Sequence, residues 1–248
     1  MVPGSPRRTA LFRRVLRADR DLAVGPGCTS VHNVRMTYRV LKLILSLLAF
    51  TLLRPRVTGL NNIPRRGPVI LASNHLSFVD SLLIPIVAPR HVTFLAKAEY
   101  FTGTGLKGRI SRWFFTTLGH IPVQRDDPRA GQRSLEDALE VLNRGGAFGI
   151  YPEGTRSRDG KLHKGHTGVA WLALAGHAPI VPVAIKGTDK VQPVGSRIPR
   201  IHRVTVEFGA AIEPARQITS GKPAQARREL TEQVMDSIHA MSGQQRAS

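Results

Sequence analysis

Apolar and polar residues alternate along the chain in blocks that predict strands and helices in turn. Short apolar runs predict strands at residues 69–73, 91–96, 119–124, 147–151, 180–185 and 204–208. Amphipathic segments between and after them predict helices at residues 80–86, 105–117, 131–143, 165–175 and 223–241. Alternation of this kind is typical of α/β proteins. We therefore expect a single domain with a mostly parallel central sheet flanked by helices.

The most apolar stretch of the chain precedes this domain, at residues 40–53. It is 14 residues long, contains Lys42, and is followed by a short basic cluster around Pro55. Because about 20 apolar residues are needed to cross a bilayer, the segment favours a helix lying in the membrane interface. Tyr38 and Lys42 would then reach towards the lipid headgroups. A helix buried against the domain is the alternative.

These patterns divide the chain into three parts. We expect residues 1–56 to form a basic N-terminal region with the membrane-associating helix, and residues 57–241 to form the α/β domain. Residues 242–248 are short and polar, which favours a disordered tail.

The charge of the chain is strongly positive, which indicates anionic partners. There are 36 Lys and Arg residues against 17 Asp and Glu, a formal net charge of +19. Such a charge attracts anionic lipids, phosphorylated small molecules and nucleic acids. No helix-turn-helix signature, zinc-finger spacing or aromatic stacking platform accompanies it, so we expect no specific nucleic-acid partner.

The single cysteine bears on the cellular compartment, and the spacing of two histidines bears on metal binding. Cys28 is the only cysteine, so no intrachain disulfide can form, as is common in a reducing compartment. Together with the apolar segment, this leads us to expect a peripheral or monotopic protein at the cytoplasmic face of the cell membrane. His163 and His166 lie three residues apart among lysines and a glycine, a poor ligand set, and we expect no metal site.

The segment NHLSFVD, which follows the predicted strand at 69–73, carries the clearest candidate chemistry. It contains His75 and Asp80. A carboxylate bonded to one imidazole nitrogen fixes the tautomer and leaves the other nitrogen free to take a proton, so the pair predicts a general base. Ser77 lies between them but is not in a G-x-S-x-G elbow, which favours a substrate hydroxyl as the attacking group. Alternatively, the segment only caps the helix that follows.

Two further strand ends carry cations. The segment GHIPVQR ends at Arg125, and the segment YPEGTRS contains Glu153 and Arg156. In open α/β sheets, ligands bind outside the carboxyl ends of the strands, so His75, Arg125 and Arg156 are expected to share one crevice.

The four segments NHLSFVD, GHIPVQR, YPEGTRS and VPVAIKG, in this order, resemble the glycerolipid acyltransferase family typified by 1-acylglycerol-3-phosphate acyltransferases. The resemblance covers residues 57–208 and departs mildly at Tyr151, where the family usually has phenylalanine. It implies that His75 takes the proton from the free hydroxyl of a lysophospholipid while Asp80 orients the ring. The donor would be an acyl thioester, either acyl-coenzyme A or acyl-carrier protein, and no cofactor would be needed.

The resemblance also implies a set of acceptor-binding residues. These are Arg125 on the phosphate, with Glu153, Gly154, Thr155, Arg156 and Lys97 around it. Glu153 would either bond the glycerol hydroxyl or hold Arg156. Gly154 is also explained by the turn alone, and Lys97 by an ordinary solvated lysine.

The function expected from the sequence is therefore conversion of 1-acylglycerol 3-phosphate to phosphatidate. Another lysolipid, such as a lyso-ornithine lipid, or glycerol 3-phosphate is the alternative acceptor. A non-catalytic, basic lipid-binding protein is the alternative of another class, but such a protein would not need both His75 and Asp80.

Overall fold

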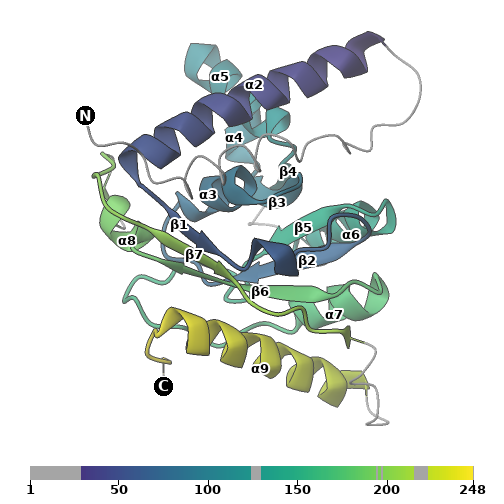
Figure 1. The fold of residues 1–248 in the computed structure, drawn as a ribbon. Coiled ribbons are helices and arrows are strands. Elements are labelled where there is room, and N and C mark those ends of the chain that lie inside the picture. Colours follow the sequence, from purple (N-terminus) through teal and green to yellow (C-terminus); the bar gives the residue numbers. More distant parts are fainter. Residues whose placement is uncertain (1–28, 124–129, 194, 197, 215–222, 248) are drawn as a thin grey trace.

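The computed structural model describes residues 29–123, 130–193, 195–196, 198–214 and 223–247, and within them a seven-stranded sheet lies between helices (Figure 1). The strands stand in the order β1-β7-β6-β2-β5-β3-β4, and every neighbouring pair is parallel except β6 and β7. Their bounds are β1 Arg56–Thr58, β2 Val69–Ser73, β3 Val92–Lys97, β4 Ile121–Val123, β5 Ala147–Ile150, β6 Ile180–Lys186 and β7 Thr205–Phe208. The predicted α/β domain with a mostly parallel sheet is confirmed.

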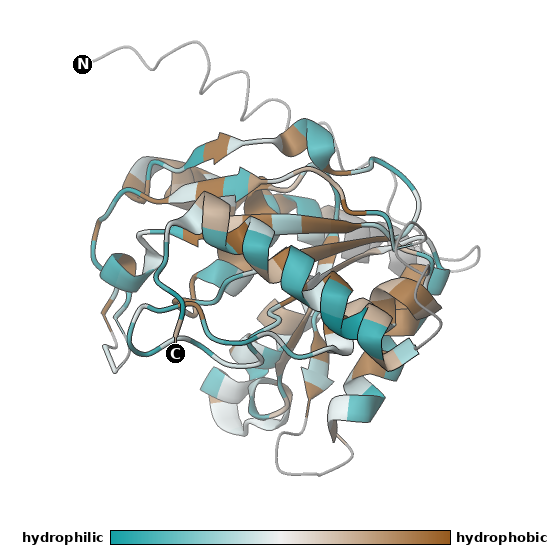
Figure 2. Ribbon diagram, turned by 90° about the horizontal axis from the view of Figure 1, so that it is seen from below, coloured by the Kyte–Doolittle hydropathy of each residue, from teal (hydrophilic) through white to brown (hydrophobic). Residues whose placement is uncertain are grey.

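Helices cover both faces of the sheet. One face carries α2 (Thr29–Leu52) and α3 (Asp80–Val87), with α4 (Glu99–Thr102) and α5 (Gly105–Thr117) beside them. The other carries α6 (Ala130–Asn143), α7 (Gly168–Ala175) and α9 (Pro223–Ser242). The short helices η2 (Leu60–Asn62) and α8 (Thr188–Val191) follow β1 and β6. Figure 2, viewed from the α9 side, shows hydrophobic strands behind a helix whose outer face is polar.

Strand β2 runs through the centre of the sheet and separates two hydrophobic cores. Val69 and Leu71 belong to the core beneath α3, whereas Ile70 and Ala72 belong to the core beneath α6, α7 and α9. This division follows from the two-residue period of a strand, which directs successive side chains to opposite faces. Because both faces are covered, β2 is buried along its whole length, and its carboxyl end is rigidly placed.

Helix α2 is longer than the predicted apolar segment, since it begins at Thr29. Tyr38 and Lys42, expected near lipid headgroups, are each only 2% exposed. The Lys42 ammonium donates a 3.4 Å hydrogen bond to the carbonyl of Ala88, at the end of α3. The expected orientation of these two side chains is therefore wrong: they lie on the side of α2 that packs on the domain. None of the described helices is both long and apolar enough to cross a membrane.

The residues after α9 pack against the domain, which corrects the expected disordered tail over its described part, residues 243–247. The Ala247 amide donates to the Leu162 carbonyl at 3.0 Å, and the Leu162 amide donates to the Gln245 carbonyl at 2.8 Å. The Gln244 side chain accepts a 2.6 Å hydrogen bond from the Asn74 amide group. The chain therefore returns to the loop that follows β2.

Candidate active site

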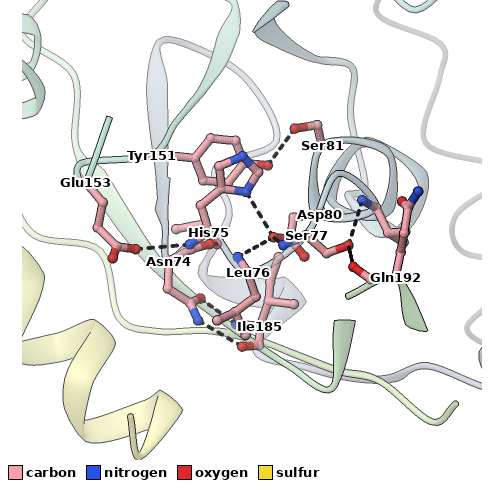
Figure 3. Close-up of polar contacts among 12 residues, drawn as sticks. Asn74, His75, Leu76, Ser77, Asp80, Ser81, Tyr151, Glu153, Ile185 and Gln192 are labelled. Atoms are coloured by element: carbon pink, nitrogen blue, oxygen red, sulfur yellow. Dashed lines mark hydrogen bonds and ion pairs between the residues drawn. The ribbon is translucent and has the colours of Figure 1, made fainter. Parts of the chain in front are cut away.

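His75 and Asp80 are in contact at the carboxyl end of β2. His75 Nδ1 lies 3.0 Å from Asp80 Oδ2, with the His75 side chain 10% exposed and the Asp80 side chain fully buried (Figure 3). An ionised carboxylate can only accept, so the bond assigns a proton to Nδ1 and leaves Nε2 as the acceptor nitrogen. The same Asp80 oxygen accepts from the backbone amides of Leu76 and Ser77, both at 2.7 Å. Asp80 therefore orients the ring and holds the loop that carries it.

Asn74 anchors this loop to the neighbouring strand β6. Its side-chain amide donates to the Ile185 carbonyl at 2.9 Å, and its side-chain oxygen accepts from the Ile185 amide at 2.8 Å. A side chain that makes both bonds replaces the backbone pairing that ends at Ser73. The position of His75 thus follows from the register of two buried strands.

Glu153 binds two backbone amide groups, a role that was not expected for it. One carboxylate oxygen accepts from the His75 amide at 3.1 Å, and the other accepts from the His163 amide at 2.9 Å. The side chain is 4% exposed, and its burial raises the pKa of the carboxyl group, against the opposing effect of these two bonds. Glu153 therefore acts as a clamp between two loops.

A cavity of about 90 Å³ opens beside the His75 ring. Lys97, the last residue of β3, and Arg156, in the loop after β5, both line it. Two cations beside an imidazole favour an anionic ligand, and an arginine can grip phosphate oxygens with two parallel hydrogen bonds. The structure thus brings together four of the predicted site residues, His75, Asp80, Lys97 and Arg156.

The other predicted site residues lie outside this cavity or outside the described residues. Gly154 has a φ of 72°, which favours glycine, so the turn after Pro152 depends on it. Thr155 is exposed in the same turn. Arg125 lies outside the described residues. Among those described, no group of three or more His, Cys, Asp or Glu side chains is arranged to hold a metal ion.

A second, larger cavity adjoins the first. Its volume is about 490 Å³, and it shares Leu95, Ala96 and Tyr151 with the cavity at His75. Its lining is largely apolar and includes Phe94, Val123, Leu135, Ile150 and Val169. A small polar compartment and a larger apolar one therefore meet at a common wall beside the imidazole.

Three residues near His75 were not predicted as site residues. Asn74 and Tyr151 lie inside the predicted segments, but their partners come from distant parts of the chain, so nothing in the local sequence indicates the contacts. His120 lies in GHIPVQR and lines the same cavity. For His120 and Tyr151 the available signal was a polar residue inside a predicted apolar strand, which is uncommon unless the residue has a role.

A histidine held by a buried carboxylate, at the end of a parallel strand and beside a cation-lined cavity, is suited to an α/β enzyme that removes a proton from a bound hydroxyl group. The comparison with known proteins makes the assignment specific. The chain belongs to the acyltransferase family, whose model matches residues 54–186.

Relatives and a solved structure support this assignment. The chain is 30% identical over 158 residues to the chloroplastic 1-acyl-sn-glycerol-3-phosphate acyltransferase BAT2 of Brassica napus, covering 63% of this chain and 44% of that protein. It thus spans less than half of that plant relative. The 1-acyl-sn-glycerol-3-phosphate acyltransferase of Bacillus subtilis is 30% identical over 149 residues, covering 59% of this chain and 68% of the relative.

The crystal structure of the 1-acyl-sn-glycerophosphate (LPA) acyltransferase PlsC from Thermotoga maritima has the same fold. It superposes with a TM-score of 0.65 at 22% identity, covering 95% of this chain and 97% of that one.

Proposed function

We propose that this protein transfers an acyl chain from acyl-coenzyme A or acyl-carrier protein to the free hydroxyl of 1-acylglycerol 3-phosphate, giving phosphatidate. The observation that carries the proposal is the His75 ring, held by Asp80 at 3.0 Å and lining a cavity with Lys97 and Arg156. The names of the relatives support the choice of acceptor.

The reaction requires one proton transfer and one acyl transfer. His75 Nε2 takes the proton of the acceptor hydroxyl as its oxygen attacks the thioester carbonyl, and the charge of Asp80 stabilises the imidazolium. A carbon–oxygen bond forms, the carbon–sulfur bond breaks, and the departing thiolate takes the proton from the imidazolium. Because a thioester is already activated, no acyl-enzyme is required. A positioned base contributes about 10²–10⁴ in rate.

The two cavities differ in polarity and suit different parts of the substrates. The polar cavity offers Lys97 and Arg156 to the acceptor phosphate, and Arg125 is a further candidate for that role from the same strand-end pattern. The apolar cavity offers about 490 Å³ to an acyl chain, whose burial is favourable at about 0.8 kcal/mol per CH₂ group. The thioester carbonyl would lie where the two cavities meet, within reach of His75.

An apolar surface on α2 and α5 supports the proposed membrane association. The two helices contact each other, and both expose large apolar side chains: Met36, Val40, Ile44, Leu47, Leu48 and Leu52 on α2, and Leu106, Ile110 and Trp113 on α5. On α2 these residues recur every three or four positions, so they form one stripe. A surface of this kind, on a protein of net charge +19, suits a peripheral or monotopic enzyme at the cytoplasmic, anionic face of the cell membrane.

The test is turnover by purified protein supplied with labelled 1-acylglycerol 3-phosphate and acyl-coenzyme A. Wild type is expected to form phosphatidate, and His75→Ala is expected to lose at least about 10²-fold in kcat. Thermal unfolding of both proteins controls for folding. Equal turnover by the two would remove His75 as the base. No turnover of any lysolipid or of glycerol 3-phosphate by wild type, with lipid binding retained, would favour the non-catalytic alternative.

A further inference from the structure

The phenol ring of Tyr151 lies flat against the imidazole of His75. The ring centroids are 3.8 Å apart and the planes differ by 10° (Figure 3). Tyr151 directly follows β5, and Ile150 pairs with Ala72 of the parallel strand β2, so the residues beyond both strands are brought to the same edge. The face contact limits tilting of the imidazole, whereas the bond to Asp80 limits its rotation in its own plane.

Two contacts hold Tyr151 in turn. Its hydroxyl lies 3.0 Å from Ser81 Oγ, and its ring packs on Phe94 with centroids 5.5 Å apart. Phe94 fits there because Gly149 has no side chain: a Cβ at Gly149 would lie 2.0 Å from the Phe94 ring. Ser81 directly follows Asp80 in the first turn of α3. The hydrogen bond from the edge of the His75 ring to Asp80 and the stack of Tyr151 on its face are therefore both connected to this turn.

The stacked ring also suits the charge that appears during the reaction. An aromatic face attracts a cation, so it favours the imidazolium that forms when His75 takes a proton. The phenol itself stays neutral, because burial raises the pKa of Tyr151 well above its usual value. The charge of Asp80 adds to this effect, and the bond to Ser81 opposes it.

We propose that Tyr151 is a positioning residue for His75, and that its hydroxyl bond to Ser81 holds the aromatic platform in place. Phenylalanine, the residue usual in the family segment, would supply the platform without this bond. The proposal rests on the proposed function in that it takes His75 to be the base.

Four variants distinguish the contribution of the Tyr151 hydroxyl from that of its ring. Tyr151→Phe and Ser81→Ala each remove one half of the hydroxyl bond, and each is expected to lower kcat roughly 2- to 10-fold. The double variant is expected to match the single ones, because both remove the same interaction. Tyr151→Leu also removes the ring and is expected to lower kcat roughly 10- to 100-fold. The acceptor KM stays unchanged throughout, because the contact acts on the base.

A spectroscopic measurement tests the positioning without any substrate. The imidazole Cε1 proton of His75, assigned by its absence from His75→Ala, lies over an aromatic ring, so its NMR signal is expected to be shifted upfield. The shift persists in Tyr151→Phe and disappears in Tyr151→Leu, so phenylalanine rescues what leucine loses.

The outcomes distinguish the two proposals. If wild type turns over no acceptor but shows the upfield shift and its loss in Tyr151→Leu, the proposed function fails and the positioning stands. The positioning is overturned if Tyr151→Leu keeps the wild-type shift or the wild-type kcat. It is also overturned if the substitutions raise the acceptor KM at constant kcat, since Tyr151 would then be a substrate contact.

Discussion

The buried imidazole of His120 destabilises the folded protein, and this loss of stability can be measured. It directly precedes β4, is 5% exposed, and neither ring nitrogen has a hydrogen-bond partner within the described part of the chain. Burial, and to a lesser extent the charge of nearby His91, lowers the pKa of His120 from 6.5 to about 4, against a smaller opposing effect of the Ser81 backbone.

This pKa predicts how stability depends on pH. In the unfolded chain the imidazole binds a proton near pH 6.5, whereas the folded protein binds one only near pH 4. As pH falls through this interval, the free energy of unfolding decreases by about 1.4 kcal/mol per pH unit, reaching a loss of about 3 kcal/mol. Well above pH 6.5 both states are neutral at this residue, and His120 contributes no pH dependence.

Substitution of His120 by phenylalanine removes this dependence. A phenylalanine ring has a similar shape, packs between Phe94 and Phe115, and leaves no unpaired nitrogen, which favours the folded state by about 1–3 kcal/mol at neutral pH. The stability advantage of His120→Phe over wild type should therefore be constant well above pH 6.5 and grow by about 3 kcal/mol towards pH 4.

The assay is urea unfolding between pH 4 and 8, followed by the fluorescence of Trp113 and Trp171. His177→Asn serves as the control, because it removes an exposed histidine with a φ of 45°, a conformation that asparagine tolerates. A difference between His120→Phe and wild type that does not change with pH would refute the reasoning. So would a variant less stable than wild type at every pH.

Three further predictions concern the site. Glu153→Gln replaces an acceptor oxygen with a donor group, so one buried backbone amide loses its partner. The free energy of unfolding should fall by about 1–3 kcal/mol, measured by thermal unfolding. An unchanged Tm would contradict the clamp. Gly149→Ala should lower kcat, because the new Cβ displaces Phe94, and Phe94→Leu in the same protein should restore part of the loss; full activity of Gly149→Ala alone would argue against the packing. Lys97→Met and Arg156→Met should each raise the acceptor KM roughly 10- to 100-fold and leave the KM of the thioester nearly unchanged. An equal rise in KM for both substrates would reject a phosphate-specific role.

The sequence predicted the larger elements well, because their patterns are local. The bounds of β2 and α5 agree with prediction at both ends, and each is a segment whose apolar or amphipathic pattern ends at polar or turn residues. β1, α4 and α8 were not predicted, since each has only three or four residues and is too short to show a period. The side of α2 that faces the domain was also assigned wrongly at Tyr38 and Lys42.

The hydrogen bonds of the candidate site were predictable only where the partners are close in sequence. His75 and Asp80 lie within one loop and helix start, so spacing alone indicates their contact. The partners of Glu153 are backbone amides, and the amide of His75 is 78 residues away, which a pattern of side chains does not encode. The stack of Tyr151 on His75 depends on the register of β2 and β5, which the sequence leaves open.

The contact between Gln244 and Asn74 has a consequence for synthesis. A chain leaving the ribosome carries the His–Asp pair long before it carries the glutamine, which lies 170 residues after Asn74. The loop ahead of the imidazole therefore receives this support only when translation has passed α9.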